Sequence, residues 1–316
     1  MGSTAPNPMV GCVIVVEDEI IAEGYTSPYG SAHAEVNAIK AVKDVSLLPK
    51  ATLYVTLEPC AHFGKTPPCS DLILAHKIPK VVIGCVDTNE KVHGKGIAKL
   101  KAAGCEVIVG VLEDACKTHH KRFFTYHAKK RPYIILKWAE SNDGFIAPLS
   151  KSETKPVWIS NSYSRQVVHQ WRAEEQAILV GANTVVQDNP SLTTREVEGS
   201  NPTRIVIDLK NSLEETYQVF NSEAKTIRLT ADTIDLQKPL ASEVCKVLHS
   251  HQINSVIVEG GQKTLQAFID ENLWDEARIF SSDLNLDNGI QKPHINGTLS
   301  SERSTGSDCL KILLND

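Results

Sequence analysis

The sequence lacks several features that would each indicate a class of protein. It contains no run of about 18 apolar residues, which a membrane-spanning helix requires. Its first residues show neither the basic segment nor the apolar segment of a signal peptide. It has 33 basic against 38 acidic residues, so a strongly basic surface for nucleic acid is not expected. Its eight cysteines are irregularly spaced, which argues against a disulfide framework. We therefore expect a cytoplasmic protein that binds neither a membrane nor nucleic acid.

Two α/β domains are expected from the length and the pattern. A chain of 316 residues exceeds one ordinary core, and short β-branched runs alternate with helical patterns, which predicts largely parallel sheets covered by helices. The basic, aromatic segment 117–131 precedes Pro132 and is interpreted as a helical linker, with Phe123 and Phe124 between the domains. The predicted domains are therefore 1–116 and 132–316.

One group of residues in the first half indicates a zinc site. His33 is followed by Glu35, and Cys60 and Cys69 each follow a proline. One imidazole and two thiols can supply three zinc ligands and leave a fourth position for water, while Glu35 remains available to move protons. This combination is the signature of zinc nucleobase deaminases, although eight residues separate the two cysteines here, where the signature has two.

The predicted elements bring these residues to one edge of a sheet. His33 and Glu35 lie in the first turn of a helix, Cys60 follows a strand, and Cys69 opens the next helix, at the edge where open α/β sheets bind ligands. Alternatively, Glu35 is an ordinary acid in a first helical turn, or the zinc is structural, with His62 as the available fourth ligand. The catalytic interpretation is favoured because four residues and two helix starts agree.

A second ligand signal lies near the C-terminus. The expected strand Ser255–Glu259 runs through Gly260 and Gly261 into a helix over 263–271. Glycines before a helix N-terminus can hold a phosphate, but they also serve any tight turn between a strand and a helix. Because the complete dinucleotide fingerprint is absent, we do not predict a Rossmann domain.

The first half resembles the deaminase half of the bifunctional pyrimidine deaminase/reductases of riboflavin biosynthesis. The resemblance lies in the segments 6–11 (PNPMVG), 33–36 (HAEV) and 55–69 (VTLEPCAHFGKTPPC), and the insert between the cysteines is specific to that family. It implies a cytidine-deaminase-like three-layer domain that deaminates 2,5-diamino-6-ribosylamino-4(3H)-pyrimidinone 5′-phosphate. It also implies that Asn7 and Asn89 contact the substrate. Lys65 would hold the ribose phosphate, its alternative being a solvated loop lysine.

The second half resembles the reductase half of the same family, through motifs such as Leu136-Lys137, Arg172-Ala173, 188–193 (DNPSLT) and 258–261 (VEGG). This implies a dihydrofolate-reductase-like α/β domain in which NADPH reduces the ribosyl group of the uracil product to ribityl. Ten residues would contact the cofactor: Glu140, Trp158, Thr184, Asp188, Leu209, Gly260, Gly261, Gln262, Lys263 and Thr264. Six would contact the substrate: Lys137, Pro156, Arg172, Leu192, Arg195 and Glu259. Before the resemblance is counted, surface ion pairs are an equal alternative for Arg172 and Arg195.

The leading hypothesis is therefore a zinc hydrolase joined to an NADPH oxidoreductase, with Zn²⁺ and NADPH as cofactors. Its partner is a phosphorylated pyrimidine riboside, and the resemblance implies a homo-oligomer, either a dimer or a tetramer. One alternative is a deaminase of another nucleobase with a non-catalytic, nucleotide-binding C-terminal domain. Another is a binding protein whose zinc is structural.

Overall fold

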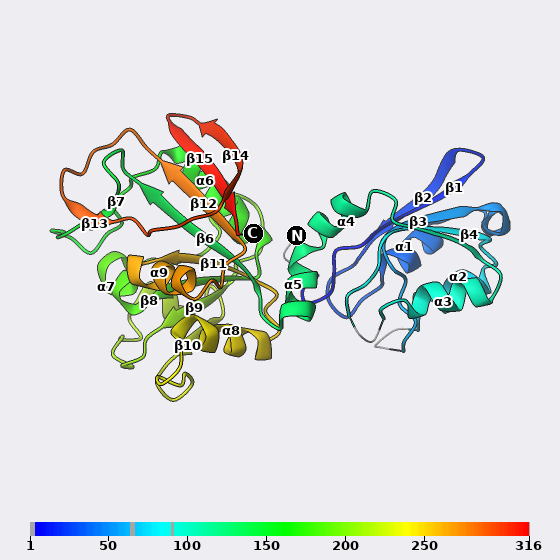
Figure 1. The fold of residues 1–316 in the computed structure, drawn as a ribbon, viewed down its shortest axis with the longest axis horizontal. Coiled ribbons are helices and arrows are strands. Elements are labelled where there is room, and N and C mark those ends of the chain that lie inside the picture. Colours follow the sequence, from blue (N-terminus) through cyan, green and yellow to red (C-terminus); the bar gives the residue numbers. More distant parts are fainter. Residues whose placement is uncertain (1–3, 64–66, 90–91, 316) are drawn as a thin grey trace. The chain divides into compact units, whose positions relative to one another are not determined.

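A computed structural model describes residues 4–63, 67–89 and 92–315 (Figure 1). The chain divides into two compact units between Lys130 and Arg131. The second unit therefore begins one residue before the predicted start at Pro132. Within the described ranges, no helix is both long and apolar enough to cross a membrane.

The helices and strands of the first unit are, in chain order, β1 (Gly11–Val16), β2 (Glu19–Tyr25), α1 (Ala34–Ala41), a 3-10 helix η1 (Val45–Lys50), β3 (Thr52–Leu57), α2 (Cys69–Ala75), β4 (Lys80–Cys85), α3 (Lys95–Ala102), β5 (Glu106–Val109), α4 (Glu113–His119) and α5 (Lys121–Lys129).

The five strands form one sheet in the order β2-β1-β3-β4-β5. β1 is antiparallel to both of its neighbours, whereas β3, β4 and β5 are parallel. Side chains alternate along each strand, so Cys12 and Ile14 of β1 are buried in the core that also contains Ala38 of α1, Ile73 of α2 and Leu100 of α3. This face of the sheet carries the helices that position the zinc residues.

Helix α4 lies on the other face, and the predicted linker segment 117–131 forms the end of α4 and helix α5. Gly84 of β4 lies against Cys116 of α4, because a side chain added at Gly84 would approach the Cys116 Sγ atom to 2.3 Å. Phe123 of α5 packs with Leu57 and Cys85 of the same unit, and Phe124 packs against that cluster. The basic, aromatic segment up to Lys130 thus belongs to the first unit, and Phe123 contributes to a core cluster of that unit.

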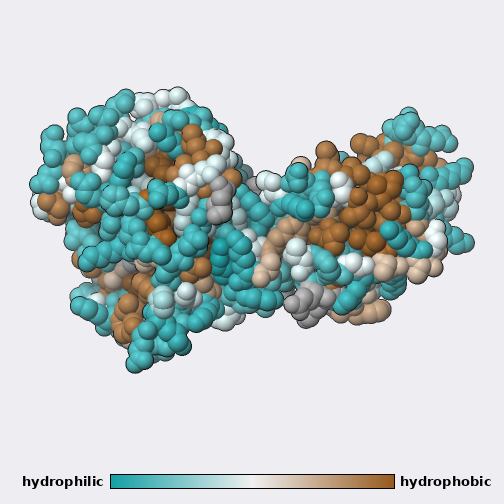
Figure 2. All heavy atoms as spheres, in the orientation of Figure 1, coloured by the Kyte–Doolittle hydropathy of each residue, from teal (hydrophilic) through white to brown (hydrophobic). Residues whose placement is uncertain are grey.

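An apolar groove lies on this second face, where the described helices leave part of the sheet open. It is lined by residues of β1 to β4 and by Leu112 and Cys116. Tyr25 and Leu112 are 78% and 76% exposed at its margin. Figure 2 shows a concentration of hydrophobic residues on this unit.

The second unit contains β6 (Tyr133–Glu140), β7 (Phe145–Pro148), α6 (Ser162–Glu174), β8 (Ala177–Gly181), α7 (Ala182–Asp188), β9 (Thr203–Ile207), a 3-10 helix η2 (Gln218–Phe220), β10 (Thr226–Leu229), α8 (Leu240–Ser250), β11 (Ser255–Gly260), α9 (Gln262–Asp270), β12 (Glu276–Ser281), β13 (Gly289–Gln291), β14 (Thr298–Thr305) and β15 (Asp308–Leu314).

Eight of these strands form a sheet in the order β10-β9-β8-β11-β6-β12-β15-β14, and β7 pairs with β13 in a separate ribbon. The strands from β10 to β12 are parallel, and β15 and β14 continue the sheet antiparallel. The prediction of a largely parallel sheet covered by helices is confirmed for this unit. Because β11 and β6 are neighbours, Glu259 and Lys137 come to the same edge.

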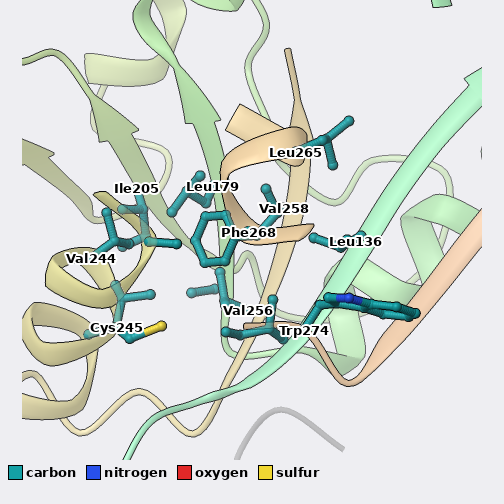
Figure 3. Close-up of a cluster of buried hydrophobic side chains, with 14 of the residues drawn as sticks. Leu136, Leu179, Ile205, Val244, Cys245, Val256, Val258, Leu265, Phe268 and Trp274 are labelled. Atoms are coloured by element: carbon teal, nitrogen blue, oxygen red, sulfur yellow. The ribbon is translucent and has the colours of Figure 1, made fainter. Parts of the chain in front are cut away.

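Two cores cover the two faces of this sheet. Val244 of α8 and Phe268 of α9 pack against Leu136, Leu179 and other strand residues on one face, as Figure 3 shows. On the other face, Val168 and Trp171 of α6 and Val185 of α7 pack against Ile178 and Ile257. The strands β6, β8, β9, β11 and β12 are therefore buried on both sides, which explains their continuous apolar sequences.

Candidate functional sites

The three predicted zinc ligands lie together. His33 is the N-cap residue of α1, Cys60 follows β3, and Cys69 is the first residue of α2. Their ligand atoms lie within 4.8 Å of one another. The His33 Nδ1 atom is 3.6 Å from Cys60 Sγ and 3.3 Å from Cys69 Sγ. One imidazole and two thiols on a common centre form a donor set that suits zinc.

The same group leaves a coordination position open. Among the described residues, His33, Cys60 and Cys69 are the only group of three or more potential ligands close enough for one metal ion. His62, the alternative fourth ligand, is exposed and is not part of that group. Three protein ligands with a free position are typical of a catalytic rather than a structural zinc site.

The surroundings of the two thiols favour a thiolate. The Cys69 thiol donates a hydrogen bond to Cys60 and, together with His33, lowers the Cys60 pKa well below its usual range. The Cys69 backbone N–H also donates to Cys60 Sγ, at 3.3 Å. The Cys69 pKa is raised because its proton is held in the bond to Cys60 and because the thiol is buried. A thiolate is the form of cysteine that binds a metal.

Glu35 lies beside this group in the first turn of α1 and is only 4% exposed. Burial raises the pKa of its carboxyl group to about 6, opposed mainly by a backbone hydrogen bond. Glu35 also hydrogen-bonds to Cys69, so it adjoins the ligand set. A carboxyl group that titrates near neutral pH can both accept and donate a proton.

Two of the three predicted substrate contacts of the first unit, Asn7 and Asn89, lie among the described residues. Lys65 lies outside the described residues. Asn7 is half-buried before β1, and its backbone N–H donates to the Thr4 carbonyl at 2.9 Å. Asn89 follows β4, and its backbone N–H donates to the Asp87 carboxylate at 2.7 Å.

Glu58 was not predicted as a site residue, although it lies two positions before Cys60. It is 4% exposed. Its carboxylate accepts hydrogen bonds from the backbone N–H groups of Asp87, Gly94, Gly96 and Ile97. Its position between a strand and a Pro-Cys pair was the available signal, but sequence spacing does not reveal these partners.

In the second unit, the structure gathers three predicted substrate residues into a buried charged cluster. The Arg172 guanidinium donates to the Glu259 carboxylate at 2.9 Å, and the Lys137 ammonium lies 4.0 Å from the other carboxylate oxygen. Burial lowers the Lys137 pKa. Burial alone would raise the Glu259 pKa, but Arg172 and Lys137 outweigh it, and the pKa is lowered. The alternative of surface ion pairing does not apply to Arg172, whose side chain is only 11% exposed.

The loop after α7 adjoins this cluster. The Arg172 guanidinium donates to the Thr193 carbonyl at 3.2 Å, next to the buried Leu192. The Arg195 guanidinium donates to the hydroxyls of Ser191 and Thr193. The Arg195 backbone N–H donates to Nδ1 of the buried His169 at 3.1 Å. His169 is a further residue that the sequence analysis did not identify.

The predicted cofactor residues around the two glycines also come together. A side chain at Gly261 would approach the Thr184 hydroxyl to 3.4 Å, and one at Gly181 would approach the Thr264 hydroxyl to 2.8 Å. Helix α9 begins at Gln262, followed by Lys263 and Thr264. The start of α9, the glycines and the start of α7 thus lie together in a glycine cradle, and glycines before a helix N-terminus can hold a phosphate.

The remaining predicted cofactor and substrate residues make contacts outside the charged cluster. Glu140 accepts hydrogen bonds from Trp138, Ser281 and Lys292. Asp188 pairs with Lys151. Trp158 is 57% exposed, with the Arg165 guanidinium 4.7 Å from the centre of its ring. Leu209 packs against the core of the unit, and Pro156 is half-buried before α6. These contacts do not join them to the Lys137–Glu259–Arg172 cluster.

Two family models match the chain. Residues 1–85 match the cytidine and deoxycytidylate deaminase zinc-binding region. Residues 132–286 match the RibD C-terminal domain. The first match contains all three predicted zinc ligands, and the second begins at the predicted start of the second domain.

Whole-chain relatives carry both parts. The riboflavin biosynthesis protein RibD of Aquifex aeolicus is 40% identical over 295 residues, which is 88% of this chain and 82% of the relative. The protein of the same name from Actinobacillus pleuropneumoniae is 41% identical, over 83% of this chain and 74% of the relative.

Solved structures agree with these matches. The diaminohydroxyphosphoribosylaminopyrimidine deaminase/5-amino-6-(5-phosphoribosylamino)uracil reductase of Thermotoga maritima has a TM-score of 0.90 at 36% identity, covering 100% of this chain and 94% of that one. Acinetobacter baumannii RibD has a TM-score of 0.88 at 30% identity, covering 99% and 94%.

Proposed function

Because the chain belongs to the riboflavin biosynthesis protein RibD family, we propose that it is a bifunctional enzyme of riboflavin synthesis. Its first activity is the zinc-dependent hydrolytic deamination of 2,5-diamino-6-ribosylamino-4(3H)-pyrimidinone 5′-phosphate. Its second is the NADPH-dependent reduction of the ribosyl group of the uracil product to ribityl. A non-catalytic C-terminal domain is disfavoured, because residues 132–286 match the C-terminal domain of RibD.

The observation that carries the deaminase proposal is the buried Glu35 beside three ligand atoms within 4.8 Å of one another. His33, Cys60 and Cys69 would hold the zinc ion, which would supply Lewis-acid activation of water. Glu35 accepts the proton of the attacking water and delivers it to the leaving amine. The amino group leaves as ammonia and a carbonyl remains on the ring. The raised Glu35 pKa suits both halves of this proton transfer.

The metal content of the purified protein tests this part of the proposal. We expect about one zinc ion per chain in the wild type and a loss of zinc in Cys60→Ser, measured by elemental analysis. The matched control is Cys309→Ser, which changes a thiol of β15 in the other unit. An active protein without zinc would contradict the proposed deamination.

The reductase proposal is carried by the Lys137–Glu259–Arg172 cluster, whose Glu259 directly precedes Gly260 and Gly261 of the glycine cradle in the chain. The backbone at Gly260 and Gly261 and the N-terminus of α9 suit the cofactor diphosphate. NADPH supplies the hydride that the sugar carbon accepts. Arg172, Lys137 and Glu259 orient the sugar through its hydroxyls, since they present donors and an acceptor beside the cradle.

Oxidation of NADPH with the deaminated ribosylamino substrate tests the second activity directly. We expect absorbance at the NADPH band to fall only when this substrate is present. No oxidation at any substrate concentration would leave the second unit as a binding module. The predicted dimer or tetramer, to be measured by analytical ultracentrifugation, and the predicted cytoplasmic location remain predictions.

A further inference from the structure

Glu58 lies where three parts of the first unit meet: the segment with Cys60, the loop after β4, and the start of α3. Its two carboxylate oxygens each accept two backbone hydrogen bonds. One accepts from Asp87 at 3.3 Å and Gly94 at 2.9 Å. The other accepts from Gly96 at 2.9 Å and Ile97 at 3.2 Å. Both oxygens are therefore engaged by backbone groups.

These bonds replace a cap that α3 does not provide for itself. The N-cap residue of α3 is Gly94, which has no side chain to accept a hydrogen bond. The first N–H groups of a helix have no partner within the helix and need an acceptor. Glu58 supplies that acceptor from a distant part of the chain, and its negative charge is also favourable at a helix N-terminus. Among the described residues, no cation forms an ion pair with Glu58.

The contact between α3 and the zinc segment is also close at the backbone level. A Cβ atom at Gly96 would lie 2.0 Å from the carbonyl oxygen of Pro59, the residue between Glu58 and Cys60. The helix therefore begins directly against the ligand segment. Any change in the position of α3 is passed to Pro59 and Cys60, because there is no space between them.

The third part is the loop after β4, which carries the predicted substrate residue Asn89. The Asp87 N–H donates to Glu58, and the Asp87 carboxylate accepts the Asn89 N–H at 2.7 Å. The Asp87 carbonyl lies 2.8 Å from Nδ1 of His93 at the far end of the loop. Glu58 thus contacts the backbone at both ends of the loop that holds Asn89.

We propose that Glu58 is a positioning residue that fixes the zinc-ligand segment relative to the described parts of the substrate loop, 87–89 and 92–94. This inference rests on the proposed deaminase function. Glu58 does not move a proton, since both of its oxygens accept backbone N–H groups. It sets the separation between the metal position and Asn89, and Glu35 lies beside the metal position.

Glu58→Gln tests the proposal with little change in size. One oxygen becomes an NH₂ group that faces two N–H donors, so two of the four hydrogen bonds are lost. Glu106→Gln is the matched control, because Glu106 lies on β5 with a 60% exposed side chain. We expect faster hydrogen exchange at Gly94, Gly96 and Ile97 in the Glu58 variant only, with exchange in β3 and β4 unchanged.

The kinetic expectation follows from geometry. Displacement by about 1 Å can cost on the order of 100-fold in rate, so deaminase kcat/KM should fall by about that factor while zinc content and NADPH oxidation stay at wild-type levels. Normal exchange at 94–97 with normal deamination in Glu58→Gln would overturn the proposal. Absence of deamination in the wild type would instead overturn the proposed function, and the exchange result would remain interpretable.

A second variant covers the case in which Glu58→Gln does not fold. Gly96→Ala keeps the carboxylate but forces the start of α3 away from the Pro59 carbonyl. We expect the same loss of deamination with zinc retained. Wild-type deamination in a folded Gly96→Ala protein would contradict the proposed coupling.

Discussion

The two candidate sites differ in how their residues are distributed along the chain. The zinc group lies between His33 and Cys69, and each ligand stands at the start of a helix or just after a strand. The second site draws on β6, α6, α7, β11 and α9, from Lys137 to Thr264. A short signature therefore reveals the first site, whereas the order of strands in the sheet creates the second. Each site is built from one unit, so we expect variants to separate the two activities.

The largest expected effect is on the first site. Glu35→Gln keeps the size of the side chain but removes the group that accepts a proton. We expect deamination to fall by about 10³-fold or more, within the range for loss of a general acid and base, with zinc content and NADPH oxidation unchanged. Ammonia release measures the first quantity. Retained turnover would remove Glu35 from its proposed role.

A smaller effect is expected at the charged cluster of the second site. Glu259→Gln leaves Arg172 and Lys137 without their carboxylate in a buried position. We expect reductase kcat/KM to fall on the order of 100-fold through lost orientation of the sugar. The free energy of unfolding should fall by roughly 1–3 kcal/mol because buried groups lose a partner.

Chemical denaturation and NADPH oxidation provide the two measurements for Glu259→Gln. Glu302→Gln on the exposed strand β14 is the control. A parallel loss of deamination in Glu259→Gln would show that the two sites are not separable.

The glycine cradle should give an effect of about tenfold. In Gly181→Ala, the new methyl group lies 2.8 Å from the Thr264 hydroxyl oxygen, so the start of α9 must shift. We expect the KM for NADPH to rise about tenfold, which corresponds to 1.4 kcal/mol.

A double variant separates this cause from general destabilisation. If the clash with Thr264 is responsible, Gly181→Ala should add little to the effect of Thr264→Ala, because the oxygen is already gone. Steady-state kinetics of the two single variants and the double variant decide this. Fully additive effects would mean that the two residues do not act on each other.

The smallest effect concerns stability and pH. Burial lowers the pKa of His120 in the first unit and of His169 in the second to about 4. Between about pH 6.5 and 4 the unfolded chain binds more protons at these histidines than the folded chain, so their contribution to stability is complete above pH 6.5 and is lost as pH falls.

His169→Asn retains an acceptor for the Arg195 N–H but cannot titrate in this range. When the pH is lowered from 7.5 to 5, we expect the Tm of the wild type to fall by about 2–4 °C more than the Tm of His169→Asn. A change of about 1 kcal/mol in the free energy of unfolding produces such a difference in a unit of this size. Calorimetry at the two pH values measures it. Equal losses in both proteins would show that His169 is not linked to folding.

Much of the fold followed from local patterns, and the errors have physical causes. The strand expected at Ser255–Glu259 and the helix expected over 263–271 agree with β11 and α9 to within one residue at each end, because each presents an apolar run or stripe to a core. β14 was not predicted, since its sequence TLSSERST has no apolar alternation and almost every residue is exposed. It is a strand because its backbone pairs with β15, which its own residues do not indicate.

The site residues also divide into those that the sequence could predict and those that it could not. The zinc ligands could be predicted because metal binding demands particular side chains at particular starts of helices. Glu58 and His169 could not, because both act on backbone N–H groups that only the tertiary structure brings near. The basic residues of the segment 117–131 likewise do not indicate that Phe123 packs on Leu57 and Cys85.

The central claim is that one chain carries two separable sites, and one paired assay tests it most directly. Ammonia release from the amino substrate and NADPH oxidation with the deaminated substrate are measured for the wild type, Glu35→Gln and Glu259→Gln. We predict both activities in the wild type, loss of ammonia release alone in Glu35→Gln, and loss of NADPH oxidation alone in Glu259→Gln. A wild type without either activity, or a folded variant that loses both, would contradict the account.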